Sequence, residues 1–379
     1  MGWKSWTFFH ILFFLTFLIS GLAINLLQGL SYLLFPKSLF RRLNYYLQWI
    51  MYGQFIFFFD WWSSSEVRMY GPSSQIKEMQ SQIGHEHAII LCNHHYETDW
   101  LFGWCIAERF RILGAAKVFM KAVLKYVPVL GWGWNLSDII FVKRNWNVDQ
   151  KLIPAAIQRL NDYPFPFWLL IYAEGTRFTK EKHLASQDFR LKSMDSNLPD
   201  LKHHLIPRTR GFYLTLMNLD FKAVPAIYDV TLVAQKETSS LLRVLNGEPL
   251  NVDAFVRRLP LDGVEKKEDS INSFLMKTYK EKDEFIDHFI NSGHFGEGTE
   301  SIHFFPKRRL HSLINAIVLN ILVLAPFFYY VIRTFIYGSS FHIGFLIAIY
   351  SLLYFGLKKM IGITKFSKSS AYGNQKKQE

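Results

Sequence analysis

Long apolar runs at both ends of this chain constrain its fold more than any other feature. The first run covers about residues 8–35, and two more cover residues 313–332 and 341–357. A helix needs roughly 20 apolar residues to cross a bilayer, so the runs predict membrane helices at both ends and a separate domain between them. Two buried core helices near the C-terminus are the alternative, which the near absence of charge in those runs disfavours.

A second aromatic-rich segment follows the first apolar run. It extends from Tyr45 to Trp62 and ends in Asp60-Trp61-Trp62. Paired tryptophans at the end of an apolar helix are typical of a membrane interface. The sequence leaves open whether this segment crosses the bilayer, dips into it or lies on its surface. We therefore assign residues 1–62 to N-terminal membrane segments.

Basic residues flank the two C-terminal apolar runs, which predict a transmembrane hairpin. Lys307-Arg308-Arg309 precede the first run, and Lys358-Lys359 follow the second. The positive-inside rule then predicts that the central domain and the tail are cytosolic, although Arg333 in the connecting loop argues mildly against this. The chain ends in Lys376-Lys377-Gln378-Glu379, which resembles a dilysine retrieval signal. We expect a multi-pass protein of the endoplasmic reticulum membrane.

The net charge of +12 invites a nucleic-acid interpretation, which the pattern does not favour. No recognised nucleic-acid module is present, and several basic clusters lie beside apolar runs. An anionic membrane surface and phosphorylated substrates explain the charge better. The chain has two cysteines, and in a cytosolic domain these predict no structural disulfide.

The stretch between the membrane segments has the pattern of an α/β domain. Helical patterns, such as residues 148–161 and 270–290, fall between or after strand-like runs. This alternation predicts a central, mostly parallel sheet flanked by helices. The strand-like runs are Ala88–Cys92, Ile139–Val142, Phe167–Tyr172 and Ala223–Leu232.

A histidine pair and an aspartate follow the first of these strands, in Asn93-His94-His95-Tyr96-Glu97-Thr98-Asp99. A histidine oriented by a carboxylate is a typical general base. His94 and Asp99 can meet if His94 lies in the turn and Asp99 reaches back, whereas His95 and Asp99 would share one face of a helix. Spacing therefore leaves two candidates for the base. A metal cluster is a weaker interpretation, because Cys92 and Cys105 match no recognised zinc spacing.

Four motifs in order resemble those of the glycerolipid acyltransferases, in particular the gamma/delta branch of the 1-acyl-glycerol-3-phosphate acyltransferases. Their order makes the resemblance far more specific than any one motif, and it covers nearly the whole chain. Further similarity extends to Tyr372-Gly373-Asn374-Gln375 in the tail. The motifs are Asn93-His94 with Asp99, Phe141-Val142-Lys143-Arg144, Glu174-Gly175-Thr176-Arg177 and Val224-Pro225-Ala226.

The resemblance implies a reaction between a fatty acyl-CoA and lysophosphatidic acid that yields phosphatidic acid. It implies that His94 is the base, because the residue after the motif histidine varies in the family, and that Asp99 orients it. Residues 63–306 would be the acyltransferase catalytic domain, and residues 307–379 the transmembrane hairpin and cytosolic tail. Acyl-CoA would be a co-substrate, so no cofactor and no metal is expected. The sequence does not predict an oligomeric state.

The second and third motifs supply the expected substrate-binding residues. Arg144 and Arg177 each follow a predicted strand, and a guanidinium offers a planar fork to phosphate oxygens. Gly175 permits a tight turn, and Glu174 is expected to hold Arg177 or the acceptor. We include Thr176 as part of the motif, and Lys143, with Lys117, as a candidate contact to the phosphates of CoA.

Two other functions are compatible with parts of this pattern. The same chemistry could serve another lysophospholipid, such as lysophosphatidylinositol or a lysocardiolipin, and no residue separates these acceptors. A membrane scaffold without activity is a different class of protein. The intact set of polar motif residues argues against a scaffold.

Overall fold

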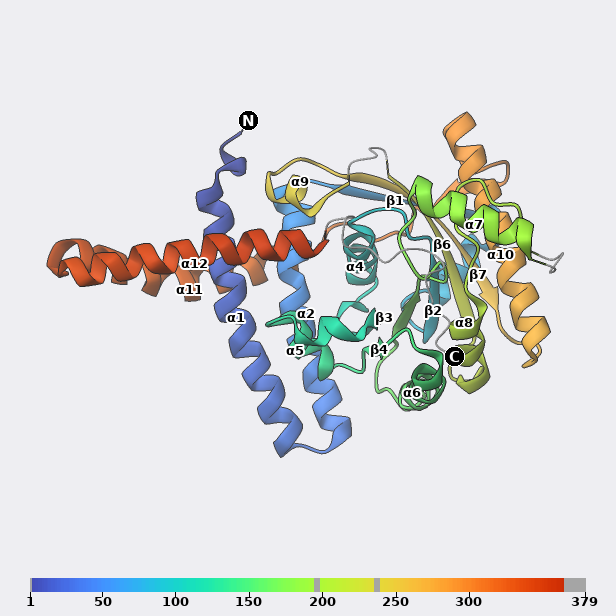
Figure 1. Cartoon of the computed structure of the whole chain (residues 1–379), viewed down its shortest axis with the longest axis horizontal. Helices are drawn as coiled ribbons and strands as arrows, with labels where there is room; N and C mark the ends of the chain where they lie inside the picture. Colours follow the sequence, from blue (N-terminus) through green and yellow to red (C-terminus); the bar gives the residue numbers. More distant parts are fainter. Residues whose placement is uncertain (1, 194–197, 235–238, 365–379) are drawn as a thin grey trace.

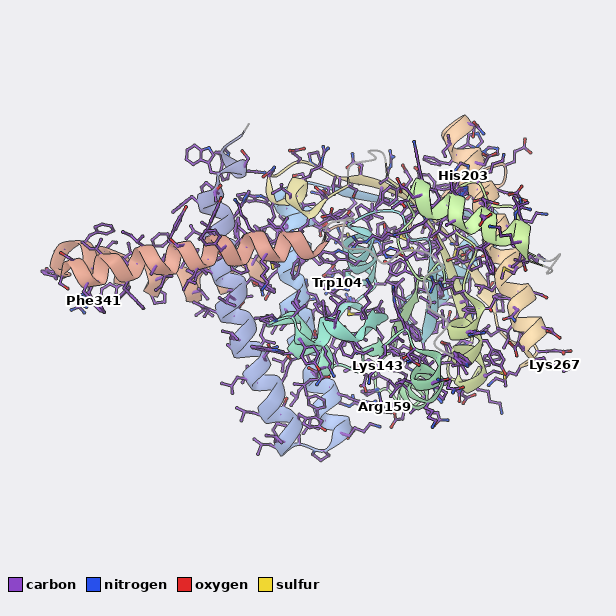
Figure 2. All side chains as sticks on the ribbon, viewed as in Figure 1. Trp104, Lys143, Arg159, His203, Lys267 and Phe341 are labelled. Carbon is purple, nitrogen blue, oxygen red and sulfur yellow. The ribbon has the colours of Figure 1, made fainter. Side chains whose placement is uncertain are left out.

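The computed structural model describes residues 2–193, 198–234 and 239–364. A pair of long N-terminal helices packs beside an α/β domain, and a helical hairpin near the C-terminus projects away from that domain (Figure 1). The dilysine end and the tail motif at residues 372–375 lie outside the described residues. Figure 2 shows Phe341 at the far end of the hairpin and Trp104 between the N-terminal helices and the sheet.

The α/β domain is built on one mixed sheet, which confirms the predicted fold class. Within the described residues the strand order is β4-β3-β5-β2-β6-β7-β1-β8. The pairs from β4 to β6 are all parallel, while β6 with β7 and β1 with β8 are antiparallel. The strands are β1 (Glu66–Pro72), β2 (Ala88–Cys92), β3 (Ala116–Lys121), β4 (Ile140–Val142), β5 (Trp168–Ile171), β6 (Ala226–Ala234), β7 (Asn251–Pro260) and β8 (Thr299–Ser301).

Helices connect the strands and cover the sheet (Figure 1). The predicted helices at residues 148–161 and 270–290 correspond to α6 and α10. The helices are α1 (Thr7–Leu34), α2 (Lys37–Phe57), α3 (Ile76–Gln82), α4 (Asp99–Arg109), α5 (Leu130–Asn135), α6 (Trp146–Gln158), α7 (Lys180–Lys192), α8 (Thr209–Asn218), α9 (Leu241–Leu245), α10 (Glu268–Ser292), α11 (Leu310–Tyr337) and α12 (Ser340–Thr364).

Strands β2, β4 and β5 run in the same direction, so their carboxyl ends share one edge of the sheet. Strand β2 lies between β5 and β6, and its five residues Ala88–Cys92 are almost wholly buried. A strand covered on both faces is expected to be continuously apolar, which explains why the sequence pattern found it. The motifs that follow these three strands are therefore brought to one edge.

Among the residues that the structure describes, three helices are long and apolar enough to cross a membrane: α1, α11 and α12. This makes the chain a membrane protein, as the sequence predicts. Helix α2 is not among the candidate spans in the described residues, and it continues into a wider turn at Phe58–Trp62. Helices α11 and α12 run across α1 and not alongside it (Figure 1).

Helix α1 also packs closely against the segment before α5. Gly21 of α1 lies so close to the side chain of Val129 that a Cβ there would overlap it.

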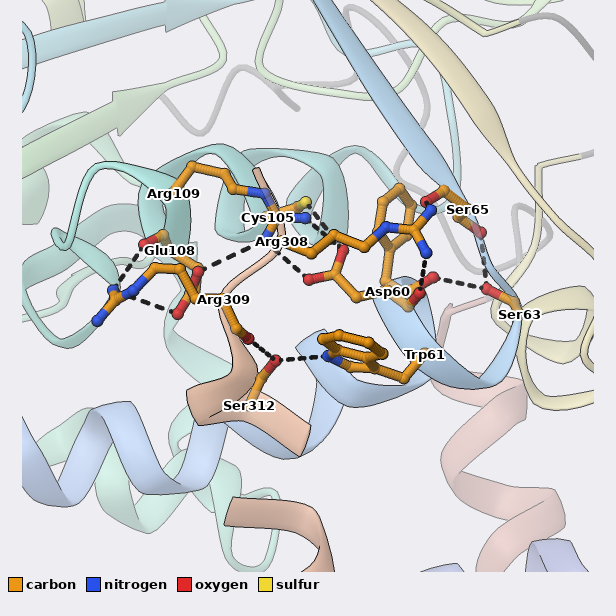
Figure 3. Close-up of polar contacts among 11 residues, drawn as sticks. Asp60, Trp61, Ser63, Ser65, Cys105, Glu108, Arg109, Arg308, Arg309 and Ser312 are labelled. Atoms are coloured by element: carbon orange, nitrogen blue, oxygen red, sulfur yellow. Dashed lines mark hydrogen bonds and ion pairs between the residues drawn. The ribbon is translucent and has the colours of Figure 1, made fainter. Parts of the chain in front are cut away.

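A buried polar network ties the C-terminal hairpin to the domain (Figure 3). Asp60, just beyond α2, accepts two hydrogen bonds from the guanidinium of Arg109 at the end of α4, at 2.6 and 2.8 Å. Arg308 donates to the backbone oxygens of Asp60 and Ser65, and Arg309 lies 3.3 Å from Glu108. Arg308 and Arg309 therefore connect the start of the hairpin to the segment after α2 and to α4, in addition to flanking a membrane helix.

Candidate active site

The turn between β2 and α4 brings His94 and Asp99 into contact. The Nδ1 atom of His94 lies 2.9 Å from Oδ2 of Asp99. Asp99 is the first residue of α4, and its carboxylate also accepts the backbone N–H of Tyr96 at 3.0 Å. His94 thus lies in the turn while Asp99 reaches back from the start of the helix. With its Nδ1–H donating to Asp99, the ring of His94 keeps a lone pair on Nε2.

The neighbouring His95 has a different environment. It precedes α4, so the helical spacing that would pair it with Asp99 does not apply. Its ring stacks on Phe178, with centroids 4.8 Å apart, and it lies 5.4 Å from the ring of His204. His95 does not line the cavity described below among the residues that the structure covers. The geometry of a base and its orienting carboxylate is found at His94.

The surroundings of His94 keep its imidazole neutral. Burial and the nearby Arg177 and Lys182 hold the pKa of His94 well below its usual range. The ring stacks on Tyr172, with centroids 4.1 Å apart. A neutral imidazole can accept a proton, so His94 is in the state that a general base requires at neutral pH.

Arg144 reaches the same edge of the sheet from the segment after β4. Its backbone has φ of +60°, a left-handed conformation that is uncommon outside glycine and is often found at functional sites. Its guanidinium donates to the backbone oxygen of Gly175 at 2.7 Å. Gly175 has φ of +69°, and a Cβ there would lie 2.9 Å from Cδ of Arg208. Glycine is therefore needed at this position both for its conformation and for the close approach of Arg208.

Residues 176–178 continue the motif after β5. Lys182 of α7 donates to the hydroxyl of Thr176 at 3.0 Å and to the backbone oxygen of Arg177 at 2.9 Å. The N–H of Phe178 donates to the backbone oxygen of His94 at 2.8 Å. These bonds fix the segment that carries Arg177 against the turn that carries His94.

Two of the expected substrate-binding residues lie away from the cavity. Glu174 is fully buried, and its carboxylate accepts the backbone N–H groups of His94 at 2.9 Å and Leu205 at 3.1 Å. Burial raises the pKa of Glu174 to about 8. Lys143 donates its backbone N–H to Asp149, and its side chain is not among the described cavity lining. Glu174 holds the catalytic turn, so its contact is with His94 and not with Arg177.

A cavity of about 1280 Å³ opens beside His94 and Asp99. Arg144, Thr176 and Arg177 line its polar part. The rest is mainly apolar and extends over α4 and residues 123–134 toward the membrane helices. Its apolar lining includes Phe55 of α2, Trp100, Trp104, Leu124, Val127, Leu130, Trp134 and Met360 of α12.

Further basic residues line the polar part of the cavity that the sequence motifs do not identify. Arg208 immediately precedes α8, Arg210 lies in the first turn of that helix, and Lys121 ends β3. Burial and the nearby Arg208 lower the pKa of Arg144, and burial together with Arg144 and Arg177 lowers the pKa of Lys121. Like charges held together in this way form a site for an anion. The sequence does show two closely spaced arginines in Pro207-Arg208-Thr209-Arg210. This run lies about 30 residues beyond the third motif, so the sequence alone does not connect it with the site.

Lys117, considered above for CoA phosphates, points into the domain. Its side chain is 2% exposed, and its Nζ lies 3.2 Å from the hydroxyl of Tyr163 and 4.5 Å from the centre of that ring. Burial lowers the pKa of Lys117 to about 8. Lys117 therefore forms part of the cavity wall, but its ammonium group is turned toward Tyr163.

Comparison with known proteins agrees with the motifs. The profile of the Acyltransferase family matches residues 72–229, and that of the Acyltransferase C-terminus family matches residues 243–319. The chain is 39% identical over 376 residues to the human 1-acyl-sn-glycerol-3-phosphate acyltransferase delta, covering 98% of this chain and 96% of that protein. The bovine delta protein is 39% identical over 375 residues, with the same coverage. The human gamma protein is 38% identical over 370 residues, covering 97% and 95%.

Proposed function

This chain belongs to the 1-acyl-sn-glycerol-3-phosphate acyltransferases, and we propose that it transfers a fatty acyl group from acyl-CoA to the sn-2 hydroxyl of 1-acyl-glycerol-3-phosphate. The product is phosphatidic acid. The observation that carries this proposal is the pairing of His94 with Asp99 at a cavity whose polar part is cationic and whose remainder is apolar. An acceptor with a phosphate and an acyl chain matches both parts.

His94 acts as the general base. Its Nε2 takes the proton of the acceptor hydroxyl as that oxygen attacks the thioester carbonyl. The C–S bond then breaks, and the thiolate of CoA leaves and receives the proton from the imidazolium. Asp99 keeps Nδ1 protonated and stabilises the imidazolium while it exists. The thioester is already activated, so the reaction needs neither a metal nor an acyl-enzyme.

The acceptor phosphate binds at the cationic part of the cavity. Arg144 and Arg177 provide guanidinium groups from two different segments, and Arg208 adds a third. The mutual repulsion of these cations is relieved when a phosphate enters, which favours an anionic acceptor over a neutral one. The apolar part of the cavity accommodates acyl chains, and its volume exceeds the roughly 300–1,000 Å³ of a typical small-molecule site.

The location of the enzyme follows from the ends of the chain. We propose a multi-pass protein of the endoplasmic reticulum membrane with the catalytic domain and tail in the cytosol. The basic flanks of the C-terminal hairpin and the terminal Lys376-Lys377 support this proposal. Both substrates are then accessible, acyl-CoA from the cytosol and the lysolipid from the bilayer.

The test is an acyl-transfer assay with the purified full chain in lipid nanodiscs. Acyl-CoA is offered with lysophosphatidic acid, lysophosphatidylinositol, lysophosphatidylcholine or monolysocardiolipin, and the products are separated by mass. We expect phosphatidic acid to form fastest, and the His94→Ala variant to form none above background. Faster acylation of another acceptor would overturn the assignment of the acceptor, and equal activity of the His94→Ala variant would overturn the mechanism.

A further inference from the structure

Two imidazole nitrogens are buried without a hydrogen-bond partner behind the catalytic turn. They are Nε2 of His95 and Nε2 of His204, as judged against the residues that the structure describes. One ring nitrogen of each histidine and a carboxylate oxygen of Glu174 lie within 4.8 Å of one another. A buried polar atom without a partner costs about 1–3 kcal/mol, so two such atoms on residues of one cluster require an explanation.

In each ring, the partner of Nδ1 determines which nitrogen carries the proton. The Nδ1–H group of His204 donates a hydrogen bond to Oδ1 of Asp283 at 2.8 Å. For His95, whose Nε2 has no partner, the backbone oxygen of His203 is the neighbouring acceptor, which favours a proton on Nδ1. Each Nε2 therefore carries a lone pair. Two lone pairs beside a buried acidic side chain need either a shared proton or a cation between them.

Glu174 supplies the third donor. Its carboxylate is buried, and the bonds that it accepts come from backbone N–H groups and not from a lysine or arginine. Each oxygen retains a lone pair that can bind a metal. Two histidines and one carboxylate form a common zinc-binding set. Histidine ligands of zinc typically donate their second nitrogen to a carboxylate or a backbone oxygen, as His204 does here with Asp283.

We propose that His95, Glu174 and His204 form a binding site for a divalent transition metal, and that Zn²⁺ is the ion it fits best. Zinc–nitrogen bonds of about 2.0–2.1 Å would draw the three donors to roughly 3.4 Å from one another, a movement within reach of side-chain adjustment. A water molecule would complete the tetrahedron.

The site has a positioning role and not a catalytic one. None of its three ligands is among the described residues that line the cavity. The metal would connect the turn after β2, the end of β5 and the segment before α8, and through Asp283 it would reach α10. Glu174 accepts the N–H of His94, so the metal would hold the catalytic turn in place. The proposal does not depend on the identity of the acyl acceptor.

The experiment measures zinc binding to the full chain in detergent, after removal of metals with a chelator. The protein is dialysed against Zn²⁺ or, as a control, Mg²⁺, and its metal content is determined by mass spectrometry. The variants are His95→Gln, His204→Gln and the matched control His203→Gln. His203 is adjacent in sequence, but its ring pairs with Asp287 near the surface.

We expect one zinc per chain, and no magnesium, in the wild type and in the His203→Gln variant. Zinc affinity of the His95→Gln and His204→Gln variants should fall by more than about 100-fold, beyond the 10–100-fold typical of outer-shell partners. Zinc should also raise the unfolding temperature of the wild type and not that of the His95→Gln variant. If the His204→Gln variant does not fold, the His95→Gln variant provides the test, because His95 is partly exposed and its replacement disturbs the core less. Substoichiometric zinc in the wild type, or unchanged binding in His95→Gln, would overturn the proposal and would mean that a proton is shared between the rings.

Discussion

Replacing Asp60 with Asn should destabilise the whole molecule more than any exposed charge change. Asp60 is 0% exposed and Arg109 is 6% exposed, and the pair is bidentate. The substitution leaves the size of the side chain unchanged but removes the negative charge. Breaking a buried ion pair by removing one partner costs about 3–5 kcal/mol, because the remaining charge is left uncompensated.

The structure places the expected cost near the lower end of this range. Glu108 lies 3.4 Å from the guanidinium of Arg109 and can partly compensate its charge. We therefore expect a loss of about 3 kcal/mol. For a domain of this size, each kcal/mol shifts the unfolding temperature by about 2–4 °C, which gives a fall of roughly 6–12 °C.

The assay is thermal unfolding of the detergent-purified chain, followed by intrinsic fluorescence at one fixed heating rate. The matched control is Asp188→Asn, which breaks an exposed pair with Lys192 at 2.6 Å on one face of α7. That control should change stability by less than about 1 kcal/mol. The double variant Asp60→Leu with Arg109→Met removes both charges and should unfold above the single variant. Equal shifts in Asp60→Asn and Asp188→Asn would refute this reasoning.

Two further predictions test the site, one tests a buried lysine and one tests the topology. His94→Ala should lower turnover by at least about 100-fold and His95→Ala by much less; the reverse order in a steady-state assay would reassign the base. Arg144→Lys and Arg177→Lys should each raise the apparent constant for the lysolipid roughly 10- to 150-fold, and a rise confined to acyl-CoA would move them to the donor site. Lys117→Met should unfold at a higher temperature than the wild type at pH 7, since a pKa lowered from 10.5 to about 8 corresponds to roughly 3 kcal/mol. This destabilisation is fully present below pH 8 and disappears by about pH 10.5, where the lysine is neutral in both states. If the difference in unfolding temperature between the variant and the wild type does not narrow as the pH rises, the buried charge is not its cause. Protease added to sealed microsomes should remove a C-terminal tag, and full protection of the tag would place the tail in the lumen.

The sequence predicted β2, β4, β5 and β6, which are largely apolar, and missed β7, which carries several charges that are paired in the fold. Strands β2 and β5 read as continuous apolar runs because both of their faces are covered. Strand β7 contains Asp253, Arg257 and Arg258, which resemble a surface segment in the sequence. In the structure Asp253 pairs with Arg68, and Arg257 pairs with Asp229. Partners so far apart along the chain cannot be inferred from local pattern.

The active site, like the sheet, could be predicted from the sequence only in part. Spacing limited the base to His94 or His95, and the resemblance to the family implied His94. The physical reason for that choice is where α4 begins, which is a property of the fold. The contact of Glu174 with the turn, and the position of Arg208 beside Gly175, arise from the approach of segments about 30 to 80 residues apart. Motifs mark the residues at strand ends, whereas the residues that complete the site come from tertiary structure.

The contact of Gly21 with Val129 bears on how this enzyme can be dissected. Val129 lies in the segment that lines the apolar part of the cavity, and it adopts a left-handed conformation with φ of +67°. Phe55 and Met360, from helices at opposite ends of the chain, also face that cavity. A fragment cut at residues 63 and 306 would keep the strands and the catalytic turn, but it would lose Asp60, Arg308 and the helices that carry Phe55 and Met360. The helices at the two ends of the chain are therefore part of the catalytic unit and not a separable anchor.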